Sequence, residues 1–395
     1  MTRTGRSSVI DETEREHRGR YKAVTVNDFR LLGLRKLHPV VRSYYESRAD
    51  QEQTLRENVA AFKRLRLRPS VLVPVDKRSI NTTLLEQPVS MPVGIGPTDL
   101  QMMANREGEI ATAVASQKEG TVMILSAMSS IPLEKVRPNA PQGIFWQELY
   151  AFKNRTVTFE IIKRAQHAGI NAFVMTLDAP TWGRRIVDER HLFITPPGIS
   201  LANLQHLGGA HDVRFERMKG CGLTKYMNDF LDPSLSWKDV AWLRSVSKLP
   251  VILKGILTAE DAATAVEVGA AAVTVSNHGG RQLDGTPATI EALPEIVAAV
   301  GDRAEVYVDG GVRTGTDVIK ALALGTKAVF VGRPVIWALS YDGRQGVRMM
   351  LDVLRTELMR AMALIGCKSA RDLGKKDVVR QEHYWVKWAE GKVKI

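Results

Sequence analysis

Residues 276–284 read SNHGGRQLD and directly follow an apolar run, so a histidine and an arginine stand together where a strand is expected to end. The neutral imidazole of His278 can accept a proton, and the guanidinium of Arg281 can bind a carboxylate through paired hydrogen bonds. The segment TLDAPTWGRR adds Asp178, which could orient the imidazole, and Arg185, which could complete a clamp on the carboxylate. These neighbouring side chains favour a role for His278 as a base that removes a proton from a carboxylate substrate. The alternative is that His278 is a structural histidine in the core.

Two glycine-containing segments nearer the C-terminus favour binding of a phosphate group. DGGVRTG (309–315) and, about twenty residues later, VGRP (331–334) offer exposed backbone N–H groups and two arginines. A phosphate on a cofactor and a phosphate on a substrate fit this pattern equally. The residues concerned are Asp309, Gly310, Gly311, Arg313, Gly332 and Arg333.

Each of these segments follows a short run rich in β-branched residues and precedes a helical pattern. Eight such runs occur after about residue 90, and eight alternating β and α units predict an α/β fold, a (β/α)8 TIM barrel. Active sites of such barrels lie at the carboxyl ends of the strands. The expected strands cover 91–96, 122–127, 143–149, 172–178, 251–255, 271–276, 305–310 and 328–333.

All eight expected strands end in polar residues or glycine, which surface composition alone does not readily explain. A buried lysine at one of these ends, Lys254, needs an anionic partner. Besides the residues already named, the ends carry Pro97, Thr98, Asp99, Ser126, Met128, Glu148, Tyr150, Thr176 and Ser276.

The rest of the chain is expected to surround the barrel. Residues 1–20 are predicted to form a flexible arm and residues 21–395 a single domain, in which N-terminal helices over 38–65 cap the barrel. KRLRLR, at 63–68, alternates charge with leucine and predicts a half-exposed strand. More than seventy residues separate the fourth and fifth strands. They include a weakly periodic segment, 196–234, which predicts a long loop acting as a lid or a partner-binding insertion.

Composition excludes several classes of protein. The formal net charge of +12 permits contact with nucleic acid, but no aromatic–basic groove motif accompanies it, so we expect no nucleic-acid partner. The sequence contains no run of about 18 apolar residues, so no membrane span is predicted, and no signal peptide is evident. We therefore expect a cytoplasmic protein. The eight histidines and two cysteines show no metal-ligand spacing, which predicts no metal site and two free thiols.

The chain resembles the FMN-dependent L-2-hydroxy acid oxidase/dehydrogenase family, which includes glycolate oxidase, lactate oxidase, lactate monooxygenase and mandelate dehydrogenase. The resemblance rests on SNHGGRQLDGTPATIEALPEI, on LPVILKGILTAEDA before it and on VDGGVRTGTDVIKALALGTKAVFVGRP after it. SYYESRADQEQTLRENVAAF and LSWKDVAWLRS are also similar to the family, and the likeness runs from about residue 24 to residue 373. It implies bound FMN as cofactor and a homo-oligomer, namely a tetramer.

The resemblance also implies roles for individual residues. By similarity, His278 is the catalytic base, Asp178 pairs with the histidinium, and Tyr150 contacts the substrate hydroxyl. The substrate carboxylate is held by Arg185, Arg281 and Tyr44, and Lys254 stabilises the reduced, anionic flavin. The remaining cofactor contacts implied are Ser126, Thr176 and Glu148 for the flavin ring system, with Pro97, Thr98, Asp99 and Ser276 beside it, and Asp309, Gly310, Gly311, Arg313, Gly332 and Arg333 for the ribityl phosphate.

Three positions depart from the family pattern, and all three are expected near the flavin. Asp99 stands where the family has a small residue, Met128 where it has an aromatic residue, and Glu148 where it has a glutamine. Two extra ionised carboxylates beside a flavin that becomes anionic are unfavourable, at about 4 kcal/mol for each like-charge contact at ~4 Å and an effective dielectric of ~20. Protonation, a compensating cation, or a polar or amino group on the substrate would relieve this repulsion.

The function expected is FMN-dependent oxidation of an L-2-hydroxy acid to the 2-keto acid, with O2 reoxidising the flavin and forming peroxide. One alternative keeps this half-reaction but passes the electrons to a quinone or a protein. Another is altered flavin chemistry on a polar- or amino-substituted acid, suggested by Asp99, Met128 and Glu148. A flavin-binding protein without catalysis is disfavoured because the catalytic set is intact.

Overall fold

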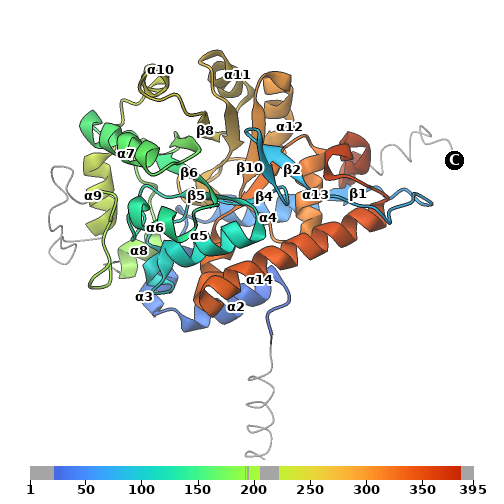
Figure 1. Cartoon of the computed structure of the whole chain (residues 1–395), viewed down its shortest axis with the longest axis horizontal. Helices are drawn as coiled ribbons and strands as arrows, with labels where there is room; N and C mark the ends of the chain where they lie inside the picture. The colour runs from blue at the N-terminus through green and yellow to red at the C-terminus, as the bar shows by residue number, and fades with distance from the viewer. Residues whose placement is uncertain (1–21, 192, 194, 205–221, 384–395) are drawn as a thin grey trace, which may run out of the picture.

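A computed structural model describes residues 22–191, 193, 195–204 and 222–383 of the chain (Figure 1). The arm predicted over residues 1–20 lies outside these residues, as does Cys221. Cys367 is buried and forms no disulfide.

Eight parallel strands close into a barrel in the order β10-β11-β4-β5-β6-β7-β8-β9. Each of the eight predicted strands is confirmed, with ends that differ by two residues or fewer. Near-continuous apolar runs form these strands because helices cover the barrel on the outside and side chains fill it inside. The strands are β4 (Val93–Ile95), β5 (Val122–Leu125), β6 (Ile144–Leu149), β7 (Ala172–Thr176), β8 (Val251–Ile256), β9 (Ala272–Val275), β10 (Glu305–Asp309) and β11 (Ala328–Val331).

The part of the barrel interior near the amino ends of the strands is an apolar core. Trp146, Tyr307 and Phe330 are its largest side chains, and their ring centroids lie 5.5 Å apart in each pair. A hairpin of β2 (Thr82–Leu84) and β3 (Gln87–Val89) adds Leu84 and Val89 to this core, so it closes the barrel at the amino ends of the strands. The opposite end of the barrel is therefore the one left for chemistry.

Helices surround the strands on all sides (Figure 1). They are α5 (Gly108–Glu119), α6 (Leu133–Asn139), α7 (Arg155–His167), α10 (Trp237–Val246), α11 (Ala259–Glu267), α12 (Thr289–Val300), α13 (Gly315–Ala323) and α14 (Arg333–Ile365). The helix predicted after β8 is confirmed with its cap, since Thr258 accepts a hydrogen bond from the backbone N–H of Asp261 at 3.2 Å.

N-terminal helices pack on this framework. Helix α2 (Val26–Lys36) runs along α14 (Figure 1), and Gly33 permits that approach because a Cβ there would lie 2.1 Å from the carbonyl oxygen of Trp337. The helices predicted over 38–65 form two elements, α3 (Pro39–Glu46) and α4 (Gln53–Lys63). The strand predicted in KRLRLR is confirmed as β1 (Leu65–Leu67), which pairs antiparallel with β12 (Val378–Arg380).

The segment between β7 and β8 differs from its prediction. It contains α8 (Ile186–His191), α9 (Gly222–Phe230) and α10, so the prediction of a loop throughout 196–234 was wrong over α9. That helix packs through Leu223 and Met227, which are buried, and a nine-residue amphipathic helix gives only a short periodic signal. None of the helices in the described residues combines the length and the apolar composition that crossing a membrane requires.

Candidate active site

A cavity opens at the carboxyl ends of the barrel strands. The cavity and its mouth together contain about 990 Å³ of space that protein atoms do not fill, part of which is open solvent. Of the predicted site residues, the walls contain Pro97, Thr98, Asp99, Ser126, Glu148, Tyr150, Arg185, Lys254, His278, Arg281, Asp309, Gly310, Gly311, Arg313, Gly332 and Arg333. Met128 also lines the cavity, whereas Tyr44, Thr176, Asp178 and Ser276 are not among its lining residues.

His278 is held by a carboxylate. Its Nδ1 lies 2.9 Å from Oδ1 of Asp178, and this contact favours the tautomer in which Nδ1–H donates to the carboxylate and Nε2 remains an acceptor. The backbone of His278 has a φ of 56°, a conformation that non-glycine residues rarely adopt, and its N–H donates to Ser276 Oγ at 3.0 Å. The end of β9 therefore fixes both the position and the protonation of the ring.

The protonation of this pair follows from its surroundings. Burial and the nearby charge of Lys254 lower the pKa of His278, although Asp178 opposes them. Burial alone would raise the pKa of Asp178, but Lys254 and His278 outweigh it and the pKa is lowered. At neutral pH the pair is therefore a neutral imidazole beside a carboxylate, which is the state a general base needs.

Lys254 is a buried cation between two carboxylates. Its Nζ lies 3.9 Å from Oδ2 of Asp178 and 3.9 Å from Oδ2 of Asp309, and no described residue accepts a hydrogen bond from it. Burial would lower the pKa of this lysine, but Asp178, Asp309 and Glu148 raise it. The ammonium is thus charged and retains its hydrogen-bond donors for a group in the cavity.

Arg185 is a second buried cation, and it has weaker protein partners. The residue is 2% exposed, and none of its three guanidinium nitrogens has a hydrogen-bond acceptor among the described residues. Asp188 lies 3.9 Å away, and the indole of Trp182 lies 4.5 Å from the guanidinium carbon. A buried guanidinium without hydrogen-bond acceptors is costly, so this arrangement favours an anionic ligand in the cavity.

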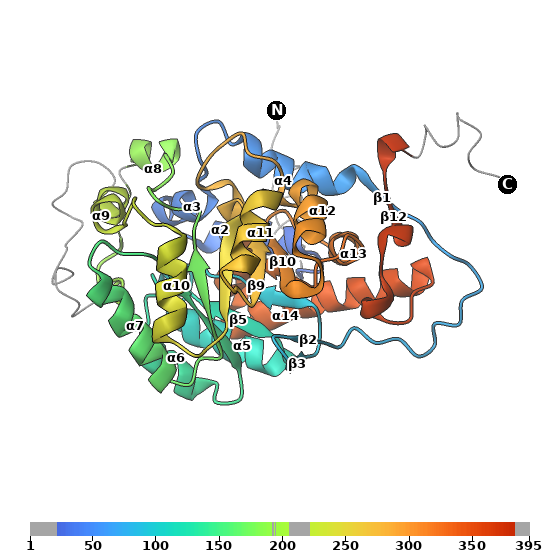
Figure 2. The same cartoon turned by 90° about the horizontal axis from the view of Figure 1, so that it is seen from above.

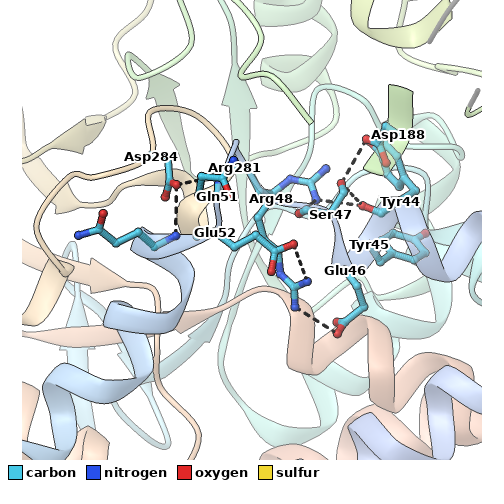
Figure 3. Close-up of polar contacts among 12 residues, drawn as sticks. Tyr44, Tyr45, Glu46, Ser47, Arg48, Gln51, Glu52, Asp188, Arg281 and Asp284 are labelled. Carbon is cyan, nitrogen blue, oxygen red and sulfur yellow. Dashed lines mark hydrogen bonds and ion pairs between the residues drawn. The ribbon is translucent and has the colours of Figure 1, made fainter. Parts of the chain in front are cut away.

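Arg281 lies beside it, anchored by α3. Its NH1 donates to the carbonyl oxygens of Tyr44 at 3.1 Å and of Ser47 at 3.3 Å, and Ser47 Oγ lies 3.1 Å from Asp188 (Figure 3). Helices α3 and α8 lie side by side in both views (Figures 1 and 2), which is what brings Ser47 to Asp188. The two arginines converge on the ring of Tyr44, at 5.2 Å for Arg281 and 5.9 Å for Arg185.

Two acidic side chains occupy the positions where the sequence departs from the family pattern. The hydroxyl of Tyr44 donates to Oδ2 of Asp99, and burial, followed by the charge of Asp99, raises the pKa of that tyrosine well above its ordinary value. The hydroxyl that resemblance assigns to the substrate carboxylate therefore already has an acceptor.

Glu148 is held by two hydroxyls. Ser126 Oγ lies 3.0 Å from one carboxyl oxygen and Thr176 Oγ1 lies 2.8 Å from the other. Burial raises the pKa of Glu148, although Lys254 and both hydroxyls oppose the shift. The predicted register is confirmed, since Glu148 and Tyr150 both reach the cavity from β6. Burial, with Glu148 next, also raises the pKa of Tyr150 well above its ordinary value, so its hydroxyl keeps its proton.

The far end of the cavity suits a phosphate. Gly310 and Gly311 have φ values of 89° and 84°, and a Cβ on Gly311 would lie 1.9 Å from the carbonyl oxygen of Asn58. Glycine is therefore required for α4 to close over this turn. Helix α14 begins at Arg333, and Gly332, Arg333 and Pro334 line the same end of the cavity.

The two arginines at this end differ. Arg333 donates to three carbonyl oxygens, those of Tyr45 at 3.0 Å, Gly279 at 2.9 Å and Ser47 at 3.0 Å. Arg313 makes one such bond, to the carbonyl of Val312 at 2.7 Å, and burial lowers its pKa to about 10. Both remain cations at neutral pH, but Arg313 has more N–H donors that are available to bind a ligand.

Sequence reasoning missed Asn58. Its side-chain amide pairs with that of Asn277 through two hydrogen bonds of 2.8 Å, which tie α4 to the end of β9. Asn58 also lines the cavity, yet it lies on a helix outside the barrel, where no strand-end rule points to it. The described residues contain no group of three or more His, Cys, Asp or Glu side chains placed to hold a metal ion.

The residues present fit FMN. A buried ammonium that donates no hydrogen bond to a described residue lies at one end, and a glycine turn with an arginine lies at the other, which matches an anionic flavin edge and a phosphate. Comparison with known proteins agrees, because the family model for FMN-dependent dehydrogenases matches residues 34–380.

Individual relatives cover nearly the whole chain. An L-lactate oxidase from Nostoc sp. is 46% identical, covering 88% of this chain and 96% of its own length. Glycolate oxidase 3 from Arabidopsis thaliana is 45% identical over 89% of this chain and 95% of its own. Among solved structures, a mutant of an active chimera of (S)-mandelate dehydrogenase superposes with a TM-score of 0.84 at 33% identity, covering 91% of this chain and all of that one.

Proposed function

Because the chain belongs to the family of FMN-dependent dehydrogenases, we propose that it oxidises an L-2-hydroxy acid to the corresponding 2-oxo acid, with O2 as electron acceptor and hydrogen peroxide as the second product. The observation that carries the proposal is that one cavity contains both a neutral His278 held by a carboxylate and the buried guanidinium of Arg185, which has no hydrogen-bond acceptor among the described residues. A base and a carboxylate site side by side match a substrate with a hydroxyl next to its carboxylate.

Arg185 and Arg281 bind the substrate carboxylate. Arg185 has three nitrogens without acceptors, and Arg281 uses only NH1 for its anchoring bonds to α3. A carboxylate between them neutralises both cations, of which Arg185 is destabilised by burial, and paired hydrogen bonds fix its plane. This orientation places the carbon 2 hydroxyl toward His278.

His278 removes the hydroxyl proton. Nε2 accepts the proton, and the imidazolium that results is stabilised by Asp178, whose Oδ1 lies 2.9 Å from Nδ1. Tyr150, in the same cavity, donates a hydrogen bond to the substrate oxygen. FMN, when bound, supplies the acceptor for the hydrogen on carbon 2 and its two electrons and passes the electrons to O2.

The cofactor contacts proposed here divide into two groups. Lys254 offers its unbonded ammonium to the electron-rich edge of the flavin, where a positive charge stabilises added electrons. The ring system is contacted from Pro97, Thr98, Asp99, Ser126 and Glu148. Thr176 holds Glu148 by a hydrogen bond, and Ser276 holds Asp309. The phosphate is bound at Gly310, Gly311, Arg313, Gly332 and Arg333, next to Asp309.

Anaerobic mixing with a panel of L- and D-2-hydroxy acids tests the proposal. At least one L-acid should bleach the blue absorption band and yield one 2-oxo acid per FMN, and air should then restore the band and release peroxide. If the absorption band persists after mixing with every L-acid of the panel, the proposed oxidation is refuted. If the band returns only when a quinone or a protein acceptor is added, that acceptor and not O2 reoxidises the flavin.

A further inference from the structure

We propose that Asp99 makes this site selective for 2-hydroxy acids whose side chain carries a hydrogen-bond donor, a hydroxyl or an ammonium group, at carbon 3. The inference rests on the proposed function, because it names the class of substrate for the same cavity. It starts from the position of one carboxylate among the groups that bind the acid.

Asp99 is held rigidly in the wall of the cavity. It follows β4, and the next residue, Leu100, has a φ of 51° and donates its N–H to the carbonyl oxygen of Met128 at 3.1 Å. One residue further, the N–H of Gln101 donates to the buried carboxyl of Glu109 at 3.0 Å. The two residues that follow Asp99 are thus each held by a backbone hydrogen bond, so its carboxylate is preorganised.

Within the described part of the chain, only one of the two carboxylate oxygens of Asp99 has a hydrogen-bond partner. The hydroxyl of Tyr44 donates to Oδ2, whereas no residue of the described part of the chain donates to Oδ1. Tyr44 cannot swing away easily, because its ring stacks on Phe193 with centroids 4.3 Å apart and planes at 21°. Oδ1 therefore remains an acceptor available to a molecule in the cavity.

The neighbours of Asp99 determine which part of the acid it meets. Arg185 and Arg281 lie against the ring of Tyr44 and bind the carboxylate of the acid. His278 accepts the proton of the carbon 2 hydroxyl. The hydrogen on carbon 2 must face the cofactor. The only remaining substituent is the side chain, so carbon 3 carries the first atoms that can reach Asp99.

A plain alkyl side chain leaves Oδ1 without a partner. Binding of the acid displaces water from the cavity, and an ionised oxygen that loses water without gaining a donor is destabilised. A hydroxyl on carbon 3 restores the hydrogen bond, and an ammonium adds an ion pair. We expect each to improve binding by roughly 10-fold to 100-fold over the alkyl acid.

The first test uses acids that cannot react. Propanoate, 3-hydroxypropanoate and 3-aminopropanoate share a carboxylate and differ at carbon 3, and none has a carbon 2 hydroxyl. Titration calorimetry on the FMN-loaded protein at pH 7 should rank them in the order amino, hydroxy, alkyl from tightest to weakest. Asp99→Ala should abolish the ranking, and Asp99→Asn should keep the preference for the hydroxyl but lose that for the ammonium.

Glu148→Gln is the matched control. This change also replaces an acid by its amide in the same cavity, but both oxygens of Glu148 already have hydroxyl partners. The ranking should survive in it. Equal affinities for all three acids in the parent, or a ranking that persists in Asp99→Ala, would overturn the inference, as would loss of the ranking in Glu148→Gln.

The second test separates this inference from the proposed function. Lactate, glycerate and 3-amino-2-hydroxypropanoate are compared by kcat/KM, and the donor-bearing acids should exceed lactate by the same factor in the parent protein but not in Asp99→Ala. If all three are oxidised equally well and Asp99→Ala changes nothing, the proposed function stands and the selectivity of Asp99 is refuted. If no L-acid of the wider panel is oxidised while the inert acids keep their ranking, the proposed function fails and the role of Asp99 as a binding residue is supported.

Discussion

Replacing Asp178 by asparagine should slow proton removal from the substrate without emptying the site. Asp178 Oδ1 lies 2.9 Å from Nδ1 of His278, and the two side chains are 11% and 15% exposed. At that separation and an effective dielectric of ~20, the attraction to an imidazolium is on the order of 5 kcal/mol. Since each 1.36 kcal/mol is tenfold in rate, the single-turnover rate should fall by roughly 10³-fold to 10⁴-fold.

The pH profile should move as well. Asp178 raises the pKa of His278, while burial and Lys254 lower it. Without the carboxylate, the pKa of His278 falls further, so the ring stays neutral to lower pH. The acid limb of kcat/KM should therefore shift to lower pH while the plateau drops.

Asp309→Asn is the comparison that isolates this effect. Both aspartates lie 3.9 Å from Nζ of Lys254, but only Asp178 contacts His278. Stopped-flow reduction of the FMN-loaded variants under anaerobic conditions gives both rates. Asp309→Asn should lose far less than Asp178→Asn. Equal losses in the two variants, or an acid limb that stays in place in Asp178→Asn, would refute the reasoning.

Three further changes probe the remaining charges. Lys254→Met removes a charge that lowers the pKa of His278, so the acid limb of kcat/KM should shift to higher pH; an unshifted limb in the pH profile would contradict this. Arg281→Lys should raise KM about tenfold or more with a smaller change in kcat, because one ammonium cannot reproduce a two-pronged contact with a carboxylate; steady-state kinetics that show an unchanged KM would place the carboxylate elsewhere. Glu148→Gln should raise Tm at neutral pH but not below the ordinary pKa of a glutamate. Burial raises the pKa of Glu148 in the folded state, so the folded parent protein binds more protons than its unfolded state. The parent protein therefore loses stability as the pH rises, and the glutamine variant does not lose this contribution. Thermal unfolding across pH 3 to 8, about the range in which the carboxyl titrates, should show that difference, and a parallel pair of curves would argue against it.

Much of the site could be predicted because strand alternation and barrel geometry act together. In FWQELY, the two-residue period of a strand puts Glu148 and Tyr150 on one face, and the structure confirms that both reach the cavity. SNHGGRQ and DGGVRTG stand at strand ends, where a closed barrel must bring them together. Local chemistry and topology agree at these positions.

Contacts between elements distant in sequence could not be predicted in the same way. Tyr44 meets Asp99 across 55 residues, and Asn58 meets Asn277 across 219, and no periodicity in one sequence encodes such pairs. The sequence also could not show that Arg333 uses its guanidinium to hold three backbone carbonyls, since the same residue in the same motif suits a phosphate equally well. Helix packing decides these contacts, and it appears only once the chain is folded.

The central claim is that His278 removes the hydroxyl proton from a 2-hydroxy acid held by Arg185 and Arg281 beside FMN. The most direct measurement is the yield of 2-oxo acid per FMN in one anaerobic turnover, for the parent protein and for His278→Gln loaded with FMN to the same extent. The parent should form one 2-oxo acid per FMN from its preferred L-acid, and the variant should do so at least about 10²-fold more slowly. Equal rates in the two proteins, or no 2-oxo acid from any acid in the parent, would contradict the account.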